Sequence, residues 1–200
     1  MTRRFVVLAA MAAFLAGASL VGAGHAQAQG FGFFDDSRDI MGGGPNFYGR
    51  GGASPIPRST VSFPANYAPG TIVINTAERR LYLVQGGGTA LAYGIGVGRD
   101  GFRWSGVHRI SAKREWPGWT PPAQMRRRRP DLPGHMAGGI DNPLGARALY
   151  LGSTLYRIHG SNEPETIGQA VSSGCFRMTN EDVSDLYNRV GVGTTVIVKN

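Results

Sequence analysis

Two residues of this 200-residue chain could form a nucleophilic pair. Cys175 is its single cysteine, and it follows His159 by sixteen positions. One cysteine cannot close a disulfide within the chain, so it is a free thiol, half of an intermolecular bridge or a nucleophile. A histidine that takes the thiol proton leaves the reactive thiolate, and the two side chains then form an ion pair. The pair therefore predicts a cysteine nucleophile with His159 as its base.

The neighbours of both residues favour catalysis over the alternative of a buried core cysteine and a hydrogen-bonded histidine. Cys175 ends the run Ser172-Ser173-Gly174-Cys175, and Gly160 follows His159. Gly174 permits a tight turn in which the N–H groups of Gly174 and Cys175 point at a developing oxyanion. No Asp or Asn adjoins His159, so we expect a backbone carbonyl, that of Gly160, to orient the imidazole.

Arg177 lies two residues after Cys175 and has two interpretations. Its guanidinium can bind a substrate carboxylate in a charge-assisted pair. Alternatively, it braces the turn by donating to backbone carbonyls.

The remaining histidines do not suggest a metal site. His108 lies in a strand-like pattern and is interpreted as structural, whereas the role of His135 stays open. One cysteine with scattered histidines has no CxxC or HExxH spacing, so zinc is not expected. No cofactor is expected either.

The N-terminus predicts export. Residues 1–28 contain two early arginines, an apolar run over 5–21 and a small-x-small cleavage site at Ala26-Gln27-Ala28. A membrane anchor is the alternative, but the run is short and interrupted by glycine and serine. We therefore expect a cleaved signal peptide, a periplasmic protein and no transmembrane anchor after cleavage.

The rest of the chain divides into a tether and one domain. Residues 29–65 are rich in Gly, Pro and Ser and are expected to form a flexible tether, unless their aromatic residues dock on the domain or on a partner. Residues 66–200 suffice for one domain.

Without residues 1–28 the net charge falls from +8 to +6, which suits a cell-wall polymer or membrane surface. Nucleic acid does not suit an exported chain. Arg126–Arg129 are expected in a solvated loop, or else against substrate.

Hydrophobic periodicity predicts a mainly β domain with one packed helix. The helix begins near Asn180, is capped by Thr179 or Asn180 and ends at Gly191. Residues 113–144 show no strong periodicity and contain Trp116 and Trp119, which indicates a long loop that covers substrate as a lid. The expected strands are 71–75, 80–84, 90–97, 107–112, 148–151, 155–159 and 194–199.

His159-Gly160 followed by the run from Ser172 to Met178 resembles the motif of the L,D-transpeptidases, which remodel bacterial peptidoglycan with a catalytic cysteine. Many members carry a second histidine just before the Gly-Cys pair, where this chain has Ser173, so that residue's role cannot be carried over. The resemblance extends from about Pro69 to Val198. Further matching segments are Gly70-Thr71-Ile72-Val73-Ile74, Arg80-Leu81-Tyr82-Leu83-Val84, Gly96-Val97-Gly98, Trp116-Pro117 and Asn142-Pro143-Leu144-Gly145.

The resemblance implies a β-sandwich or barrel like that of the L,D-transpeptidases, with one packed helix and a lid. It implies that Cys175 is the nucleophile, His159 the base, and Ser172 to Gly174 the frame of the oxyanion site. The substrates would be peptidoglycan stem peptides, the acceptor a diaminopimelate amine or an outer-membrane protein, and carbapenems would be inhibitors. Two alternatives remain: a carboxypeptidase or hydrolase using the same pair, and a non-catalytic wall-binding module.

Overall fold

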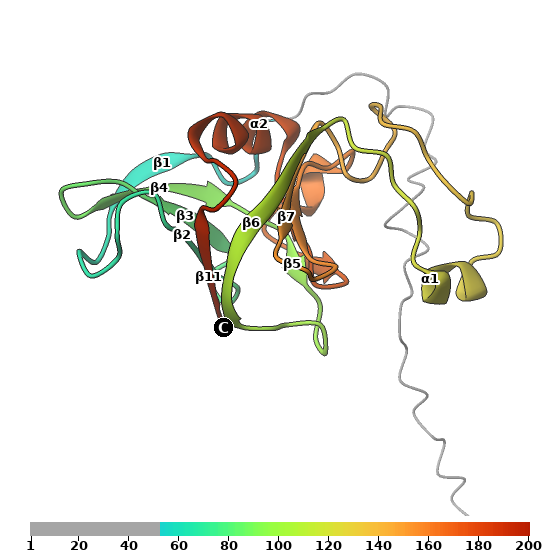
Figure 1. Cartoon of the computed structure of the whole chain (residues 1–200), viewed down its shortest axis with the longest axis horizontal. Coiled ribbons are helices and arrows are strands. Elements are labelled where there is room, and N and C mark those ends of the chain that lie inside the picture. Colours follow the sequence, from blue (N-terminus) through green and yellow to red (C-terminus); the bar gives the residue numbers. More distant parts are fainter. Residues whose placement is uncertain (1–52) are drawn as a thin grey trace, which may run out of the picture. The chain divides into compact units, whose positions relative to one another are not determined.

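The computed structural model describes residues 53–200, and strands predominate in it, as the sequence predicts. Nine strands form one sheet in the order β1-β4-β3-β2-β11-β6-β7-β8-β10, and two more form a small parallel sheet, β5-β9 (Figure 1). Their bounds are β1 Ser59–Ser62, β2 Ile72–Asn75, β3 Arg80–Val84, β4 Thr89–Gly94, β5 Val97–Gly98, β6 Gly106–Glu115, β7 Arg147–Leu151, β8 Arg157–His159, β9 Ala170–Ser172, β10 Phe176–Arg177 and β11 Thr195–Lys199.

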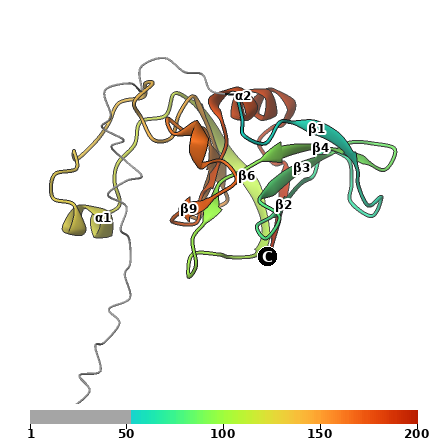
Figure 2. The same ribbon diagram turned by 180° about the vertical axis from the view of Figure 1, so that it is seen from behind.

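The long strand β6 joins the two halves of the sheet. Its residues 106–109 pair with β11, and its residues 110–115 pair with β7. The register shifts between Ile110 and Ala112, which marks an irregularity of the β-bulge kind. Such irregularities bend a strand, so β6 can turn from one half to the other. Figure 2 shows β6 crossing the molecule between these groups of strands.

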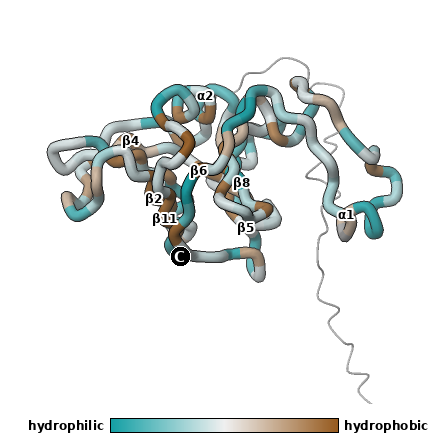
Figure 3. The backbone as a smooth tube through the Cα atoms, viewed as in Figure 1, coloured by the Kyte–Doolittle hydropathy of each residue, from teal (hydrophilic) through white to brown (hydrophobic). Residues whose placement is uncertain are grey.

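Helix α2, Asn180–Arg189, packs against the second half of the sheet at β7 and β8. The Thr179 hydroxyl accepts a hydrogen bond from the Asp182 N–H at 3.1 Å, which confirms the expected cap. Val183 and Leu186 are fully buried and join one core cluster with residues of both sheet halves. The apolar strands β2 and β11 form part of this core, and Figure 3 shows them as strongly hydrophobic. Each fully buried Leu or Ile contributes about 1.5–3 kcal/mol.

The expected tether boundary at residue 65 is wrong, because the domain includes residues before it. Strand β1 lies inside the 29–65 range and pairs antiparallel with β4. Ile56 packs so closely on Gly94 that a Cβ there would lie 2.5 Å from the Ile56 Cβ. The polar strand STVS lacks the apolar alternation that marks a half-buried strand, and it forms because the edge of β4 supplies backbone partners.

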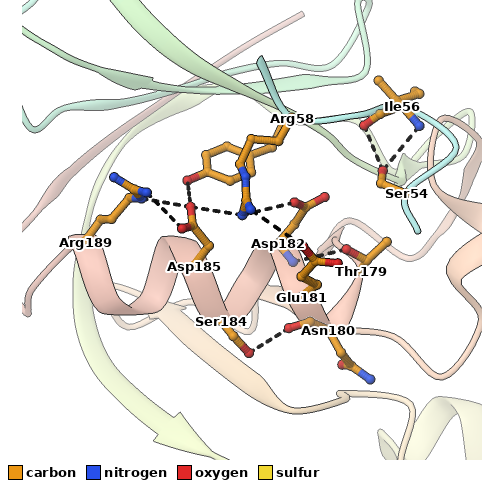
Figure 4. Close-up of polar contacts among 11 residues, drawn as sticks. Ser54, Ile56, Arg58, Thr179, Asn180, Glu181, Asp182, Ser184, Asp185 and Arg189 are labelled. Atoms are coloured by element: carbon orange, nitrogen blue, oxygen red, sulfur yellow. Dashed lines mark hydrogen bonds and ion pairs between the residues drawn. The ribbon is translucent and has the colours of Figure 1, made fainter. Parts of the chain in front are cut away.

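Arg58 also fastens this segment to helix α2. Its Nη1 lies 3.2 Å from Asp185 Oδ2 and 3.5 Å from Asp182 Oδ1, and its Nη2 lies 3.6 Å from Glu181 Oε1 (Figure 4). Asp185 also accepts a hydrogen bond from the Tyr93 hydroxyl at 2.6 Å. The predicted signal peptide and residues 29–52 of the predicted tether lie outside the described residues.

Most other elements match the prediction, with differences at their ends. Strand β6 continues to Glu115, so the long connection begins at Trp116 rather than at Lys113. The predicted strand 90–97 is divided into β4 and β5, and strand β8 begins at Arg157, two residues after the expected start at Leu155, which is 77% exposed. The short strands β9 and β10 were not predicted, nor were two short helices, α1, Ala123–Arg128, and the 3-10 helix Pro164–Thr166. Within residues 53–200, no helix has the length and apolar character to span a bilayer.

Candidate active site

Parallel pairing of β8 with β10 brings the two predicted catalytic segments together. Phe176 is in register with Ile158, and Arg177 with His159, and Cys175 directly precedes this paired stretch. The Met178 N–H donates to the His159 carbonyl at 2.8 Å and extends this pairing. Side chains alternate along a strand, so the fully buried Ile158 faces the core while its two neighbours face the other way.

His159 and Cys175 line one cavity of about 650 Å³. The strand side contributes Leu155, Tyr156, Arg157, His159, Ser172, Ser173, Cys175 and Arg177. Phe102 also lines the cavity, and the 116–146 segment contributes Trp119, Thr120, Pro122, Ala123, Met125, Pro143 and Leu144. The predicted lid segment therefore forms a wall of the cavity that holds the candidate nucleophile.

The His159 imidazole is held by the backbone. Its Nδ1 lies 2.6 Å from the Gly160 carbonyl oxygen. A carbonyl only accepts, so Nδ1 donates, and Nε2 of the neutral ring is the acceptor nitrogen. Burial, followed by the charge of Arg177, lowers the pKa of His159 to about 3, against the hydrogen bond to Gly160. The ring is therefore a neutral base at physiological pH, oriented by the carbonyl that the sequence suggested.

The Cys175 thiol donates to the Leu155 carbonyl at 3.8 Å. Burial raises the pKa of this thiol, while the charge and N–H groups of Arg157 and the charge of Arg177 oppose that rise. The thiol and the imidazole are thus both favoured in their neutral forms. The resting ion pair that the sequence predicted is disfavoured, because both groups are removed from water.

Ser172 organises the turn before the nucleophile. Its hydroxyl donates to the Cys175 carbonyl at 2.5 Å and accepts from the Gly174 N–H at 3.2 Å. The Gly174 N–H was expected to point at an oxyanion, but here it is engaged by Ser172. Of the two N–H groups that were expected to bind an oxyanion, those of Gly174 and Cys175, the Cys175 N–H is therefore the one that Ser172 does not engage.

An aromatic pair, which the sequence pattern did not reveal, holds Gly174. The Trp104 indole N–H donates to the Gly174 carbonyl at 2.8 Å. The Trp104 ring stacks on Tyr156 at 4.4 Å with an interplanar angle of 12°. Gly174 has φ +107°, and a Cβ there would lie 2.6 Å from the Tyr156 ring. Only glycine fits this position without displacement, which gives the Gly-Cys pair its structural reason.

Arg177 forms a buried ion pair. Its Nη1 lies 3.1 Å from Glu163 Oε2, and the two side chains are 9% and 6% exposed. The guanidinium borders the cavity but is paired within the fold, which favours the bracing interpretation, with a carboxylate in place of the expected backbone carbonyls. Sequence reasoning missed Glu163, because fourteen positions and a 3-10 helix separate it from Arg177.

Gly160 allows the end of β8, where His159 lies, to pack closely against the start of α2. A Cβ on Gly160 would lie 2.3 Å from Asn180 Oδ1 and 3.2 Å from the Gly145 Cα. Asn180 Oδ1 accepts from the Ala146 N–H at 2.8 Å, so the end of the lid segment is tied to the same place. The glycines at 145 and 160 permit this close approach of three chain segments.

The lid segment has its own small apolar cluster of Trp119, Leu132 and Leu144, with Met125 and Met136 packed against it. Figure 1 shows α1 standing apart from the strands. Arg126, Arg127 and Arg128 are exposed and do not line the cavity, and Arg129 pairs with Asp131. Part of the predicted arginine loop is thus a helix with a solvated basic face. In residues 53–200, no cluster of three His, Cys, Asp or Glu residues is placed to hold a metal ion.

The amino-acid sequence matches a known protein family and individual known proteins. Residues 69–198 match the YkuD family, described as the L,D-transpeptidase catalytic domain. Probable L,D-transpeptidase YbiS of Escherichia coli strain K12 is 42% identical over 134 residues, which cover 62% of this chain and 43% of that protein. Probable L,D-transpeptidase YcfS of the same strain is 39% identical over 139 residues, which cover 64% and 43%. The matched region spans less than half the length of these curated relatives.

Solved structures share the fold. L,D-transpeptidase 3 from Mycobacterium tuberculosis superposes with a TM-score of 0.53 at 17% identity, over 65% of this chain and 60% of that one. At this identity the likeness bears on the fold alone. A Brucella melitensis chain named as a probable carnitine operon oxidoreductase is 51% identical over 71% of this chain and 92% of that one, with a TM-score of 0.49. That superposition carries no argument on function.

Proposed function

Because this chain belongs to the L,D-transpeptidase catalytic-domain family, we propose that it is a cysteine-dependent acyltransferase of peptidoglycan stem peptides. One observation carries the proposal beyond the family: Cys175 and an oriented, neutral His159 line the same cavity. A thiol with a base beside it is the requirement for covalent acyl transfer.

In the first half-reaction, the Cys175 sulfur attacks the carbonyl that follows the L-configured centre of diaminopimelate. The thiol proton passes to Nε2 of His159, which can accept it because Nδ1 donates to Gly160. The carbonyl oxygen becomes an oxyanion, which the Cys175 N–H stabilises. Collapse breaks the peptide bond, His159 returns the proton to the leaving D-amino acid, and a thioester remains on Cys175.

In the second half-reaction, an amine attacks the thioester and His159 takes its proton. The sulfur leaves as thiolate and recovers that proton, so the enzyme returns to its starting state. A second diaminopimelate amine gives a cross-link, and an amine of an outer-membrane protein gives an anchor. Water as acceptor would give the carboxypeptidase or hydrolase outcome.

The same proposal includes an exported location. A signal peptide over residues 1–28 and a tether that ends before Ile56 would place the domain in the periplasm, beside its substrate. The net charge of +6 without residues 1–28 suits the carboxylates of stem peptides.

Mass spectrometry of peptidoglycan fragments incubated with the purified protein tests the activity. With a diaminopimelate-containing acceptor present, we expect a product joined by loss of the terminal D-amino acid. Shortened donor alone, with or without acceptor, would support the hydrolase instead. Binding of fragments without any change in mass would support the wall-binding module.

β-Lactams offer an independent test of the nucleophile. Mycobacterium tuberculosis L,D-transpeptidase 3 has been solved with a faropenem-derived adduct. We propose that a carbapenem likewise acylates Cys175, because its strained carbonyl resembles the substrate amide. Intact-protein mass spectrometry should show one adduct on the wild type and none on Cys175→Ala. A wild type that reacts with iodoacetamide but with no carbapenem would contradict this assignment.

A further inference from the structure

Arg157 borders the same cavity as the proposed nucleophile and base. It lies two residues before His159 on β8, so both side chains project from the same face of the strand. Arg157 and Cys175 directly precede the paired residues Ile158 and Phe176, so they lie at neighbouring ends of the β8–β10 pair. The two side chains therefore border one cavity from adjacent strand ends.

The guanidinium of Arg157 is restrained but lacks a carboxylate partner. Its Cζ lies 5.2 Å from the centre of the Tyr150 ring, a cation–π contact that restricts its position. Its Nε is buried and has no hydrogen-bond partner among residues 53–200. Within the same residues no ion pair joins Arg157 to an acidic side chain, whereas Arg177 is paired with Glu163.

The other groups that face Cys175 are less suited than Arg157 to balance the negative charge of the Cys175 thiolate. His159 is held neutral by burial and by the adjacent charges of Arg177 and Arg157. Arg177 of β10 is neutralised by Glu163. The lid residues that line the cavity are all uncharged. Among residues 53–200, Arg157 is therefore the positive charge near the thiol that no ion pair offsets, and it is first among the groups that lower the thiol's pKa against burial.

We propose that Arg157 is a further catalytic residue, whose guanidinium stabilises the Cys175 thiolate. Cys175 then needs no resting imidazolium beside it, and His159 serves as a neutral proton acceptor. The thiol proton moves to Nε2 of His159 during attack, and the negative charge on sulfur is met by Arg157. This role rests on the proposed function of Cys175, but thiol ionisation can be measured without any peptidoglycan substrate.

The test is the pH profile of Cys175 alkylation by iodoacetamide, followed by intact-protein mass spectrometry. Two neutral variants, Arg157→Met and Arg157→Gln, both remove the charge but differ in how the new side chain packs. If one of them fails to fold, the other can still be measured. Arg157→Lys restores a charge, and Arg114→Met is the control because it removes an exposed arginine from β6. Thermal melting confirms that each variant is folded.

We expect the neutral variants to move the alkylation midpoint upward by about one to three pH units. Alkylation at pH 7 should then slow at least about tenfold. Arg157→Lys should lie between these variants and the wild type, and Arg114→Met should match the wild type. A merely structural role for Arg157 would lower the melting temperature without moving the midpoint.

Identical profiles for the wild type and the folded neutral variants would overturn the proposal. The proposal would also be overturned if the variants kept the wild-type alkylation profile and raised KM only for peptides with a free carboxylate, because Arg157 would then bind substrate. A shifted profile in a protein that forms no transpeptidation product would instead uphold the role of Arg157 and contradict the proposed function.

Discussion

The two walls of the cavity are built differently. The wall with Cys175 and His159 stands on β8 and β10, whose inward residues Ile158 and Phe176 belong to the main core. The wall formed by the lid depends on its own cluster of Trp119, Leu132 and Leu144. Reacting groups need fixed distances, which a large core provides, whereas a cover over a substrate needs only local order. We therefore expect substitutions in the lid cluster and substitutions in the catalytic wall to have different effects on activity and stability.

The largest effect should come from the nucleophile. Cys175→Ala should reduce transpeptidation by about 10⁴-fold or more, while the melting temperature stays near that of the wild type. Cys175→Ser should also be inactive, because a hydroxyl ionises at far higher pH than a thiol. Product formation by mass spectrometry and melting by circular dichroism give the two readouts. Appreciable turnover by Cys175→Ala would refute the mechanism.

Gly174→Ala should damage the rigid wall next most strongly. The new Cβ would strike the Tyr156 ring and occupy a φ of +107°, so the turn would have to move. We expect a loss of about 1–3 kcal/mol in unfolding free energy and a large loss of kcat. Gly86→Ala is the control, because a Cβ there meets nothing within 4 Å. Equal behaviour of the two variants would show that the turn tolerates displacement.

Matched leucine truncations compare the two walls directly. Leu149→Ala in the main core should cost about 2–5 kcal/mol and unfold the domain at a lower temperature. Leu132→Ala in the lid cluster should raise KM while the main thermal transition moves much less. Thermal unfolding and steady-state kinetics on both variants provide the measurement. A large shift of the main transition in Leu132→Ala would mean that the lid and the core unfold as one unit.

Arg177→Lys distinguishes bracing from substrate binding. If the buried pair with Glu163 braces the turn, we expect a loss of about 1–3 kcal/mol with activity per folded molecule nearly unchanged. Arg189→Lys is a matched control, because its pair with Asp185 is more exposed and its loss should change stability less than the loss of the buried pair. A variant of unchanged stability whose kcat/KM falls would instead assign Arg177 to the substrate.

The effect that is smallest at neutral pH comes from the titration of His159. The pKa of His159 is about 3 in the folded protein, below its ordinary value of 6.5. The unfolded chain therefore binds the proton more readily, and folding stability should fall as pH drops from about 6.5 toward 3. The slope is at most about 1.4 kcal/mol per pH unit. His159→Gln should lose this component, whereas His135→Gln, at an exposed site, should keep it. Parallel curves for the wild type and His159→Gln would contradict a buried neutral ring.

Local patterns in the sequence were enough to predict the main elements and to single out Cys175 and His159, which line one cavity. The apolar spacing in 180–190 and the Thr179 cap define α2, and alternating apolar runs define most strands. Cys175, His159 and Gly160 were recognisable because their chemistry depends on residue type and on immediate neighbours. Each of these features involves contacts within a few positions along the chain, so periodicity and composition report it.

Only the tertiary structure decided which distant groups meet. Strand β1 depends on the edge of β4, the Arg177 pair depends on Glu163, and Trp104 reaches Gly174 across seventy positions. Arg157 became a candidate only when the parallel β8–β10 pairing brought it to the same cavity as Cys175. The neutral forms of His159 and Cys175 follow from burial, which no local pattern specifies. Long-range pairing and desolvation are properties of the folded chain, and they set the electrostatics of this site.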